Sequence, residues 1–184
     1  MKPAPRTSAT PARMWPWFGC FHPVWPAAVW LPSALGVIGW GLTKHQSVWW
    51  QTIPWAVAAL LAWSFFEYLI HRFVLHPSEQ FQRIERFAYY AHGEHHDEPD
   101  QPAYALVPPL NAALILLPLL TLFYFAVPAK WLEIFTGFFL LGYLAYEYVH
   151  FAIHQRQPRS RLIQHLRRHH LTHHAHGHEG NFGV

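Results

Sequence analysis

Charged residues are scarce in this chain of 184 residues, where lysine, arginine, aspartate and glutamate make up only 12%. Disordered proteins and tails that wrap nucleic acid need charge to stay solvated, so the composition excludes both classes and a nucleic-acid partner. A single cysteine excludes a disulfide scaffold and any cysteine-rich zinc or iron–sulfur module. The formal net charge of +3 is too small to name a partner.

Histidine is present in excess instead. The chain has 16 histidines against 10 aspartates and glutamates, in a background that is 52% hydrophobic and 17% aromatic. Any account of function therefore has to explain why so many imidazoles occur in so apolar a chain.

Three long runs contain no charged side chain: residues 15–43, 45–66 and 101–129, of 29, 22 and 29 residues. A fourth run, from Leu132 to about Phe151, is interrupted only by Glu147. A bilayer core about 30 Å thick needs about 20 helical residues, whereas a soluble helix of this length needs a charged face. We therefore predict an all-α integral membrane protein with transmembrane helices over residues 24–43, 49–70, 103–127 and 132–153. A soluble bundle of unusually apolar helices is the alternative, and the mean hydropathy of +0.05 does not decide between them.

Positive charge predicts the orientation of these helices. With four spans, one side holds 11 lysines and arginines, and the other holds only Lys44 and Lys130. The positive-inside rule then places both termini and the middle loop in the cytoplasm. We expect residues 1–23 to form a flexible arm and residues 24–184 to form a single membrane domain, with a cytosolic cap built from residues 71–102 and 154–184.

The histidines gather in four short motifs, HRFVLH, HGEHH, HFAIH and HLTHH, all on the predicted cytoplasmic side. At about 100° per residue, positions i, i+3 and i+4 fall within one 100° arc of a helix, so the histidines of HGEHH and of HLTHH can converge. The two histidines of HFAIH differ by about 40°. His71 and His76 would point about 140° apart on a continuous helix, but Pro77 disfavours the α conformation at His76 and is expected to end the helix there.

Two carboxylates lie beside these motifs. Glu67 is four residues before His71, and Glu147 is three residues before His150. A carboxylate in the last turn of a span costs on the order of 3 kcal/mol if it faces lipid, so we expect both to face the bundle interior. There each could accept the other N–H of a ligating imidazole and fix its tautomer. Interfacial pairing with Arg72 or a neighbouring arginine is the alternative.

Ten imidazoles are too many for one metal ion of four to six ligands, so the count indicates two ions with about five nitrogens each. Imidazole suits zinc, copper, iron and nickel, so the ligand type does not select the metal. The tail could alternatively be a histidine-rich tract that binds metal loosely. The remaining histidines are expected to be interfacial (His22, His45) or peripheral and solvated (His165, His169, His176, His178).

Four sequence blocks resemble, in order, the histidine boxes of the fatty acid hydroxylase and sterol desaturase superfamily: FFEYLIHRFVLH, AHGEHH, YEYVHFAIH and RRHHLTHH. The segments HHDEPDQPAYALVPP and NFGV are similar to the fatty acid 2-hydroxylase branch. The resemblance covers about Phe65 to Val184. It implies a membrane-embedded base of four helices, a cytosolic helical cap and a dinuclear site that uses O₂ to hydroxylate an acyl chain. The implied ligands are His71, His76, His92, His95, His96, His150, His154, His170, His173 and His174.

The sequence departs from the family pattern in two ways. It has no HPGG motif of a fused haem domain, so we expect electrons from a separate donor of the cytochrome b5 or ferredoxin/reductase type. Family members continue past the FG segment with an aromatic stretch that packs on the cap, whereas this chain stops at Val184, which leaves a truncation open.

Hydroxylation of an unactivated C–H bond needs a redox metal, so we predict two functional iron ions, although zinc could occupy the site in a structure. The expected substrate is the acyl chain of a fatty acid or ceramide, oxidised at carbon 2. Tyr104, Tyr143, Tyr146 and Phe151 are candidates to line its path, or they are plain packing residues. A desaturase or a carotenoid or sterol hydroxylase is the alternative within the family. A metal transporter is disfavoured because the central thirds of the spans carry essentially no ionisable groups.

Overall fold

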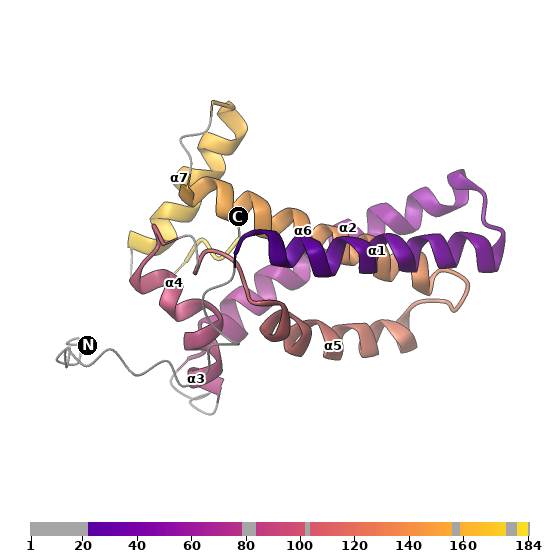
Figure 1. Cartoon of the computed structure of the whole chain (residues 1–184), viewed down its shortest axis with the longest axis horizontal. Helices are drawn as coiled ribbons and strands as arrows, with labels where there is room; N and C mark the ends of the chain where they lie inside the picture. Colours follow the sequence, from indigo (N-terminus) through magenta and orange to yellow (C-terminus); the bar gives the residue numbers. More distant parts are fainter. Residues whose placement is uncertain (1–21, 79–83, 102–103, 156–158, 176–179, 184) are drawn as a thin grey trace.

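The computed structural model describes residues 22–78, 84–101, 104–155, 159–175 and 180–183, and every regular element in these ranges is helical. Most of the predicted arm, and His176 and His178, lie outside the described residues. Four long helices run side by side, and each is apolar and long enough to cross a membrane (Figure 1). They are α1 (Val24–His45), α2 (Trp49–Ile70), α5 (Pro109–Ala126) and α6 (Leu132–Gln155). The predicted all-α membrane architecture is confirmed.

Helix α6 is the central element, because it packs against α1, α2 and α5. A Cβ atom on Gly137 would lie 2.9 Å from the Ala34 carbonyl oxygen, so only glycine lets α1 and α6 approach this closely. One and a half turns further on, Gly142 makes room for Trp63 of α2. Trp63 is buried, and its ring packs edge-on against Phe139 with centroids 5.3 Å apart. Small residues on α6 therefore bring the bundle together and carry its C-terminal end to the site.

Helix α5 begins at Pro109, six residues after the predicted start of the third span at residue 103. Pro108 has an extended ψ of 140°, and Pro109 occupies the first helical turn, where its missing N–H is tolerated. The prediction placed the start too early because it counted uncharged residues and kept these prolines inside the span, whereas they mark the beginning of the helix. The residues just before Pro108 are left as a loop beside the end of α6, which matters for the site.

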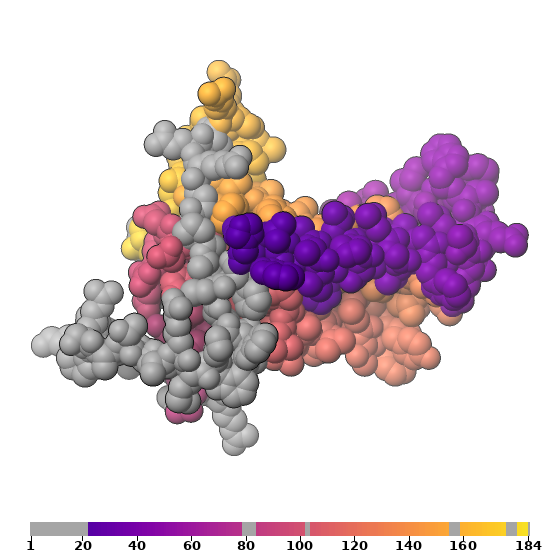
Figure 2. All heavy atoms as spheres, in the orientation of Figure 1, coloured from indigo at the N-terminus to yellow at the C-terminus, as the bar shows by residue number. Residues whose placement is uncertain are grey.

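The other helices form a cap at one end of the bundle (Figure 1). A π-helical turn, η1 (His71–Leu75), continues α2 and is followed by α3 (Glu85–Ala88), η3 (Tyr89–Gly93) and α4 (Glu94–Asp97). Helix α7 (Arg161–Ala175) completes the cap and packs on α6. Figure 2 shows the bundle extending away from the cap. Most of its outer side chains are exposed and apolar, as expected for a surface that faces lipid.

Candidate metal centre

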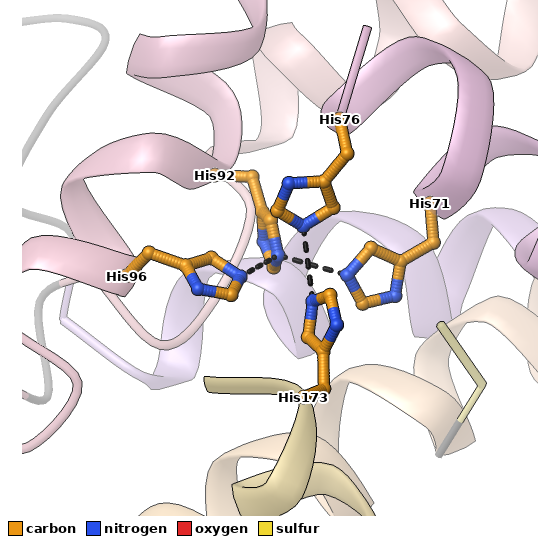
Figure 3. Close-up of side chains that lie close together, drawn as sticks. All are labelled: His71, His76, His92, His96 and His173. Carbon is orange, nitrogen blue, oxygen red and sulfur yellow. Dashed lines mark hydrogen bonds between the residues drawn. The ribbon is translucent and has the colours of Figure 1, made fainter. Parts of the chain in front are cut away.

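The ten histidines of the four motifs form two separate groups of five, and within each group the candidate ligand atoms lie within 4.8 Å of one another. We name the first the α2 cluster and the second the α6 cluster, after the helix whose end contributes two imidazoles. The α2 cluster is His71, His76, His92, His96 and His173, and Figure 3 shows their rings converging on a common centre. The α6 cluster is His95, His150, His154, His170 and His174.

The π-helical turn after α2 explains how two histidines five residues apart can face one centre. The His76 N–H donates to the His71 carbonyl at 3.0 Å, which is the i to i+5 bond of a π-helix. The two rings consequently stack with centroids 5.1 Å apart. The helix ends at His76, with φ −118° and ψ 65°, as expected before Pro77. The prediction of the break is confirmed, but the π turn before it brings the two imidazoles together.

The spacing of HGEHH and of HLTHH suggested that the three histidines of each motif converge on one point. The structure instead divides them between the two clusters. In HGEHH, His92 and His96 join the α2 cluster and His95 joins the α6 cluster. In HLTHH the allocation is reversed: His170 and His174 join the α6 cluster and His173 joins the α2 cluster. In a helix, i+4 lies about 40° to one side of i and i+3 about 60° to the other. A helix placed between two centres can therefore serve both.

The spacing of the ring nitrogens fits metal ligation. Nitrogens about 2.1 Å from one ion lie about 3.0 Å apart at right angles and about 3.4 Å apart in a tetrahedron. In the α2 cluster, three pairs of Nε2 atoms are 3.0 Å apart: His71–His92, His92–His96 and His76–His173. In the α6 cluster, the Nε2 atoms are 2.9 Å apart in His150–His170 and 3.1 Å apart in His95–His154 and His170–His174. These separations are therefore compatible with imidazoles that share one metal ion in each cluster.

Two backbone carbonyls fix the tautomers of two candidate ligands. His150 donates from Nδ1 to the Ala105 carbonyl at 2.9 Å, and His173 donates from Nδ1 to the Gly180 carbonyl at 2.7 Å. A carbonyl only accepts, so a neutral ring then presents its Nε2 lone pair to the cluster. Sequence reasoning missed these partners because every residue has a carbonyl.

Burial holds other candidate ligands in the neutral form that binds metal. Loss of water, reinforced by neighbouring imidazoles, lowers the pKa of His92, His95 and His170 below the ordinary value. All three lie outside the candidate membrane spans. These imidazoles are therefore neutral, and able to bind a metal ion, at pH 7.

Glu67 and Glu147 both face the bundle interior, with exposed fractions of 7% and 1%. A Glu67 oxygen lies 3.5 Å from His71 Nδ1, close to the expected position. Glu147 instead accepts the Val107 backbone N–H at 2.8 Å, two residues from the carbonyl that orients His150. The contact of Glu147 with the cluster is thus indirect. Arg72, the alternative partner, bonds the Tyr68 hydroxyl.

A cavity between α2, α5 and α6 reaches the α2 cluster from the membrane side. It is lined by apolar side chains and by His71, both carboxylates, Tyr143 and Tyr146. Tyr143 and Tyr146 were candidates for this position, whereas Tyr104 and Phe151 are not among its described lining residues.

The other histidines that the structure describes lie outside the two clusters. His45 lies 3.3 Å from Glu133 at the far end of the bundle, and His22 is exposed before α1. His165 is exposed and His169 half-buried on α7, and neither belongs to a cluster.

Comparisons with known proteins agree with this geometry. The chain is 29% identical over 164 residues to a dihydroceramide fatty acyl 2-hydroxylase of Arabidopsis thaliana, spanning 88% of this chain and 68% of the relative. It is 32% identical over 131 residues to the fatty acid 2-hydroxylase of Homo sapiens, spanning 66% of this chain and 34% of that protein.

A solved structure described as full-length Scs7p, with only its hydroxylase domain visible, has the same fold. Its TM-score is 0.82 at 23% identity, over 91% of this chain and 63% of that one. Residues 56–184 match the fatty acid hydroxylase family itself. The chain therefore belongs to the fatty acid hydroxylase family of oxidoreductases.

Proposed function

We propose that this protein is an O₂-dependent membrane hydroxylase of lipid acyl chains, and that its ten clustered histidines hold two iron ions. The observation that supports this most is the pair of five-imidazole clusters, with neighbouring Nε2 atoms about 3 Å apart and a cavity leading to one of them from the membrane side. Imidazole ligands suit iron, and when bound the iron pair would supply the redox chemistry that zinc lacks.

The proposed substrate is the acyl chain of a fatty acid or ceramide, oxidised at carbon 2. The relatives in Arabidopsis and human are named for this position, and the cavity offers mainly apolar side chains to a chain that rises from the bilayer. His71, Glu67 and Glu147 lie at the same cavity, so a carbon held there would lie next to the α2 cluster. Buried aromatic and aliphatic walls also exclude water from the reacting carbon.

The reaction consumes a second substrate and needs outside electrons. One C–H bond, O₂, two electrons and two protons give one C–OH group and one water. We assign the electrons to a separate redox protein of the cytochrome b5 or ferredoxin/reductase type. It would dock on the cap, since the described clusters lie at that end of the bundle.

We further propose that the cap and both termini face the cytoplasm. Arg86, Arg159, Arg161 and Arg168 are at the cap end, whereas Lys44 and Lys130 are at the opposite end of the bundle. This distribution supports a cytoplasmic cap by the positive-inside rule. Protease protection of epitope tags in sealed vesicles tests it: tags at the two termini should be cleaved from the cytoplasmic side.

The test of function is oxygen insertion by the purified protein. We expect iron-loaded protein, given reductant and isotopically labelled O₂, to add one labelled oxygen to a fatty acid or ceramide, detected by mass spectrometry. His95→Ala is the matched control, because it removes one imidazole from a cluster. Loss of two hydrogens without oxygen gain would instead identify a desaturase. Metal uptake into vesicles, without any dependence on O₂, would identify a transporter.

A further inference from the structure

A short segment after α7, Gly180–Gly183, lies directly against the α2 cluster. Its first carbonyl accepts the His173 Nδ1–H at 2.7 Å. The Phe182 ring then covers three of the five imidazoles, with centroids 5.3 Å from His173, 5.8 Å from His76 and 6.0 Å from His71. The segment therefore touches this cluster through both its backbone and its side chain.

Phe182 also contacts residues of α2 and η1. The Arg72 guanidinium lies 5.8 Å from the Phe182 ring, and the Tyr68 ring packs edge-on at 6.4 Å. Arg72 also bonds the Tyr68 hydroxyl and lies 5.1 Å from the Phe73 ring, so it is itself fixed by aromatic neighbours. Phe182 is therefore close to both Arg72 and the imidazoles.

The backbone of the segment turns sharply to make both contacts possible. Asn181, between the carbonyl and the ring, has a left-handed φ of 56°, which asparagine and glycine adopt more readily than other residues. At Gly183 a Cβ atom would lie 3.8 Å from a Glu67 carboxylate oxygen, so the chain also reaches the group beside His71. The left-handed turn brings the Gly180 carbonyl and the Phe182 ring to the same cluster.

We propose that Gly180–Gly183 is the positioning element of the α2 cluster, and that Phe182 is its key residue. The segment fixes His173 in the tautomer that presents Nε2 and shields three imidazoles from water. The α6 cluster has a different support, the Ala105 carbonyl on the loop that Glu147 anchors. Damage to the segment should therefore weaken metal binding at one cluster only. This inference rests on the proposed metal site, because it assumes that both clusters bind iron.

The test uses two pairs of variants of the full chain, loaded with ferrous iron. Phe182→Ala removes the ring, and Phe182→Leu keeps an apolar cover. Asn181→Val disfavours the left-handed turn, and Asn181→Gly permits it. Loss of a group that orients a ligand typically lowers metal affinity about 10- to 100-fold. We expect this loss in Phe182→Ala and Asn181→Val for one of the two irons, and near wild-type binding in Asn181→Gly, with Phe182→Leu in between.

Iron titration and Mössbauer spectra measure the effect, and two backgrounds assign it. In His150→Ala, where only the α2 cluster is intact, Phe182→Ala should weaken binding of the remaining iron about 10- to 100-fold. In His76→Ala, where only the α6 cluster is intact, it should change nothing further. If a background variant fails to fold, the Asn181 pair still reports, because one iron signal should change in Asn181→Val and neither in Asn181→Gly.

Two results would overturn the inference: unchanged affinity and spectrum of both irons in Phe182→Ala and Asn181→Val, or equal weakening of both irons. These readouts do not depend on lipid oxidation. If wild-type protein binds two irons and oxidises no lipid, the proposed function fails while the inference stands. If the wild-type protein hydroxylates lipid and Phe182→Ala leaves iron binding unchanged, the proposed function stands while the inference about Gly180–Gly183 fails.

Discussion

The two histidine clusters have similar ligands and different surroundings. Each takes two imidazoles from the end of a bundle helix and three from the two cap motifs. The α6 cluster is supported from within the bundle, by the Ala105 carbonyl and by Glu147. The α2 cluster is supported by Gly180–Gly183, at the edge of the cap. Two clusters with the same number of imidazoles can therefore differ in how firmly their ligands are held. Ala105 is buried, whereas the described residues 180–183 are half-buried or exposed.

A second difference is between motifs. HRFVLH and HFAIH each serve one cluster, whereas HGEHH and HLTHH each serve both. A shared motif therefore carries ligands of both clusters, so a change of its backbone should affect both, whereas the loss of one of its imidazoles should affect one.

The largest effect is expected from two adjacent residues of one shared motif. His95→Ala should deplete the α6 cluster, and His96→Ala should deplete the α2 cluster, because the two side chains belong to different groups. Each should lower lipid oxidation on the order of 100-fold or more, since loss of a ligand exceeds the effect of losing its outer partner. Mössbauer spectra of the two variants should lack different iron signals. Loss of the same signal in both would contradict the division into clusters.

Glu147→Ala should weaken only the α6 cluster. It leaves the Val107 N–H without its acceptor, at a stability cost of about 1–3 kcal/mol, and frees the loop that orients His150. We expect iron affinity there to fall about 10- to 100-fold. Iron titration measures it.

Glu147→Gln is the matched control, because its amide oxygen still accepts the Val107 N–H. If both variants lose iron equally, the charge matters rather than the loop. If the α2 cluster loses iron instead, the described anchor is wrong.

Gly93→Ala should disturb both clusters by a smaller amount, because the residue lies in a shared motif. A Cβ atom there would lie 2.6 Å from the Tyr89 ring, and the Tyr89 hydroxyl is held by Asp97 at 3.0 Å. Overpacking of this kind costs about 1–3 kcal/mol, which thermal unfolding of the metal-loaded protein should detect. Adding Tyr89→Ala should restore stability and iron content, and a double variant as unstable as the single one would contradict the steric cause.

The smallest expected difference is in the rate of metal loss. Two imidazoles of the α2 cluster, His76 and His96, are half-buried, whereas only His174 is so in the α6 cluster. A chelator should therefore remove the α2 iron first, by a factor of a few. Stopped-flow absorbance of the iron–chelator complex gives both rates. Equal rates would mean that burial of the ligands does not control release.

Several features could be predicted from the sequence for physical reasons. The presence and number of the membrane-crossing helices follow from long runs with few charges, since bilayer thickness sets span length and charge is costly within it. The start of α5 was wrong because Pro108 and Pro109 override hydropathy. The number of clustered histidines indicated two ions. Motif spacing suggested that HGEHH and HLTHH each converge on one point, whereas the allocation depends on where each helix lies between the clusters.

The sequence by itself determined that four apolar spans bring ten histidines to one end of the molecule, because hydropathy and spacing are local properties of the chain. Only the tertiary structure decided which imidazole joins which cluster, since positions i+3 and i+4 of a motif diverge by about 100° and the choice depends on the helices around it. It also decided that Ala105 and Gly180 orient His150 and His173. A backbone carbonyl leaves no signature in a sequence, and only packing brings one within hydrogen-bond distance of a ring.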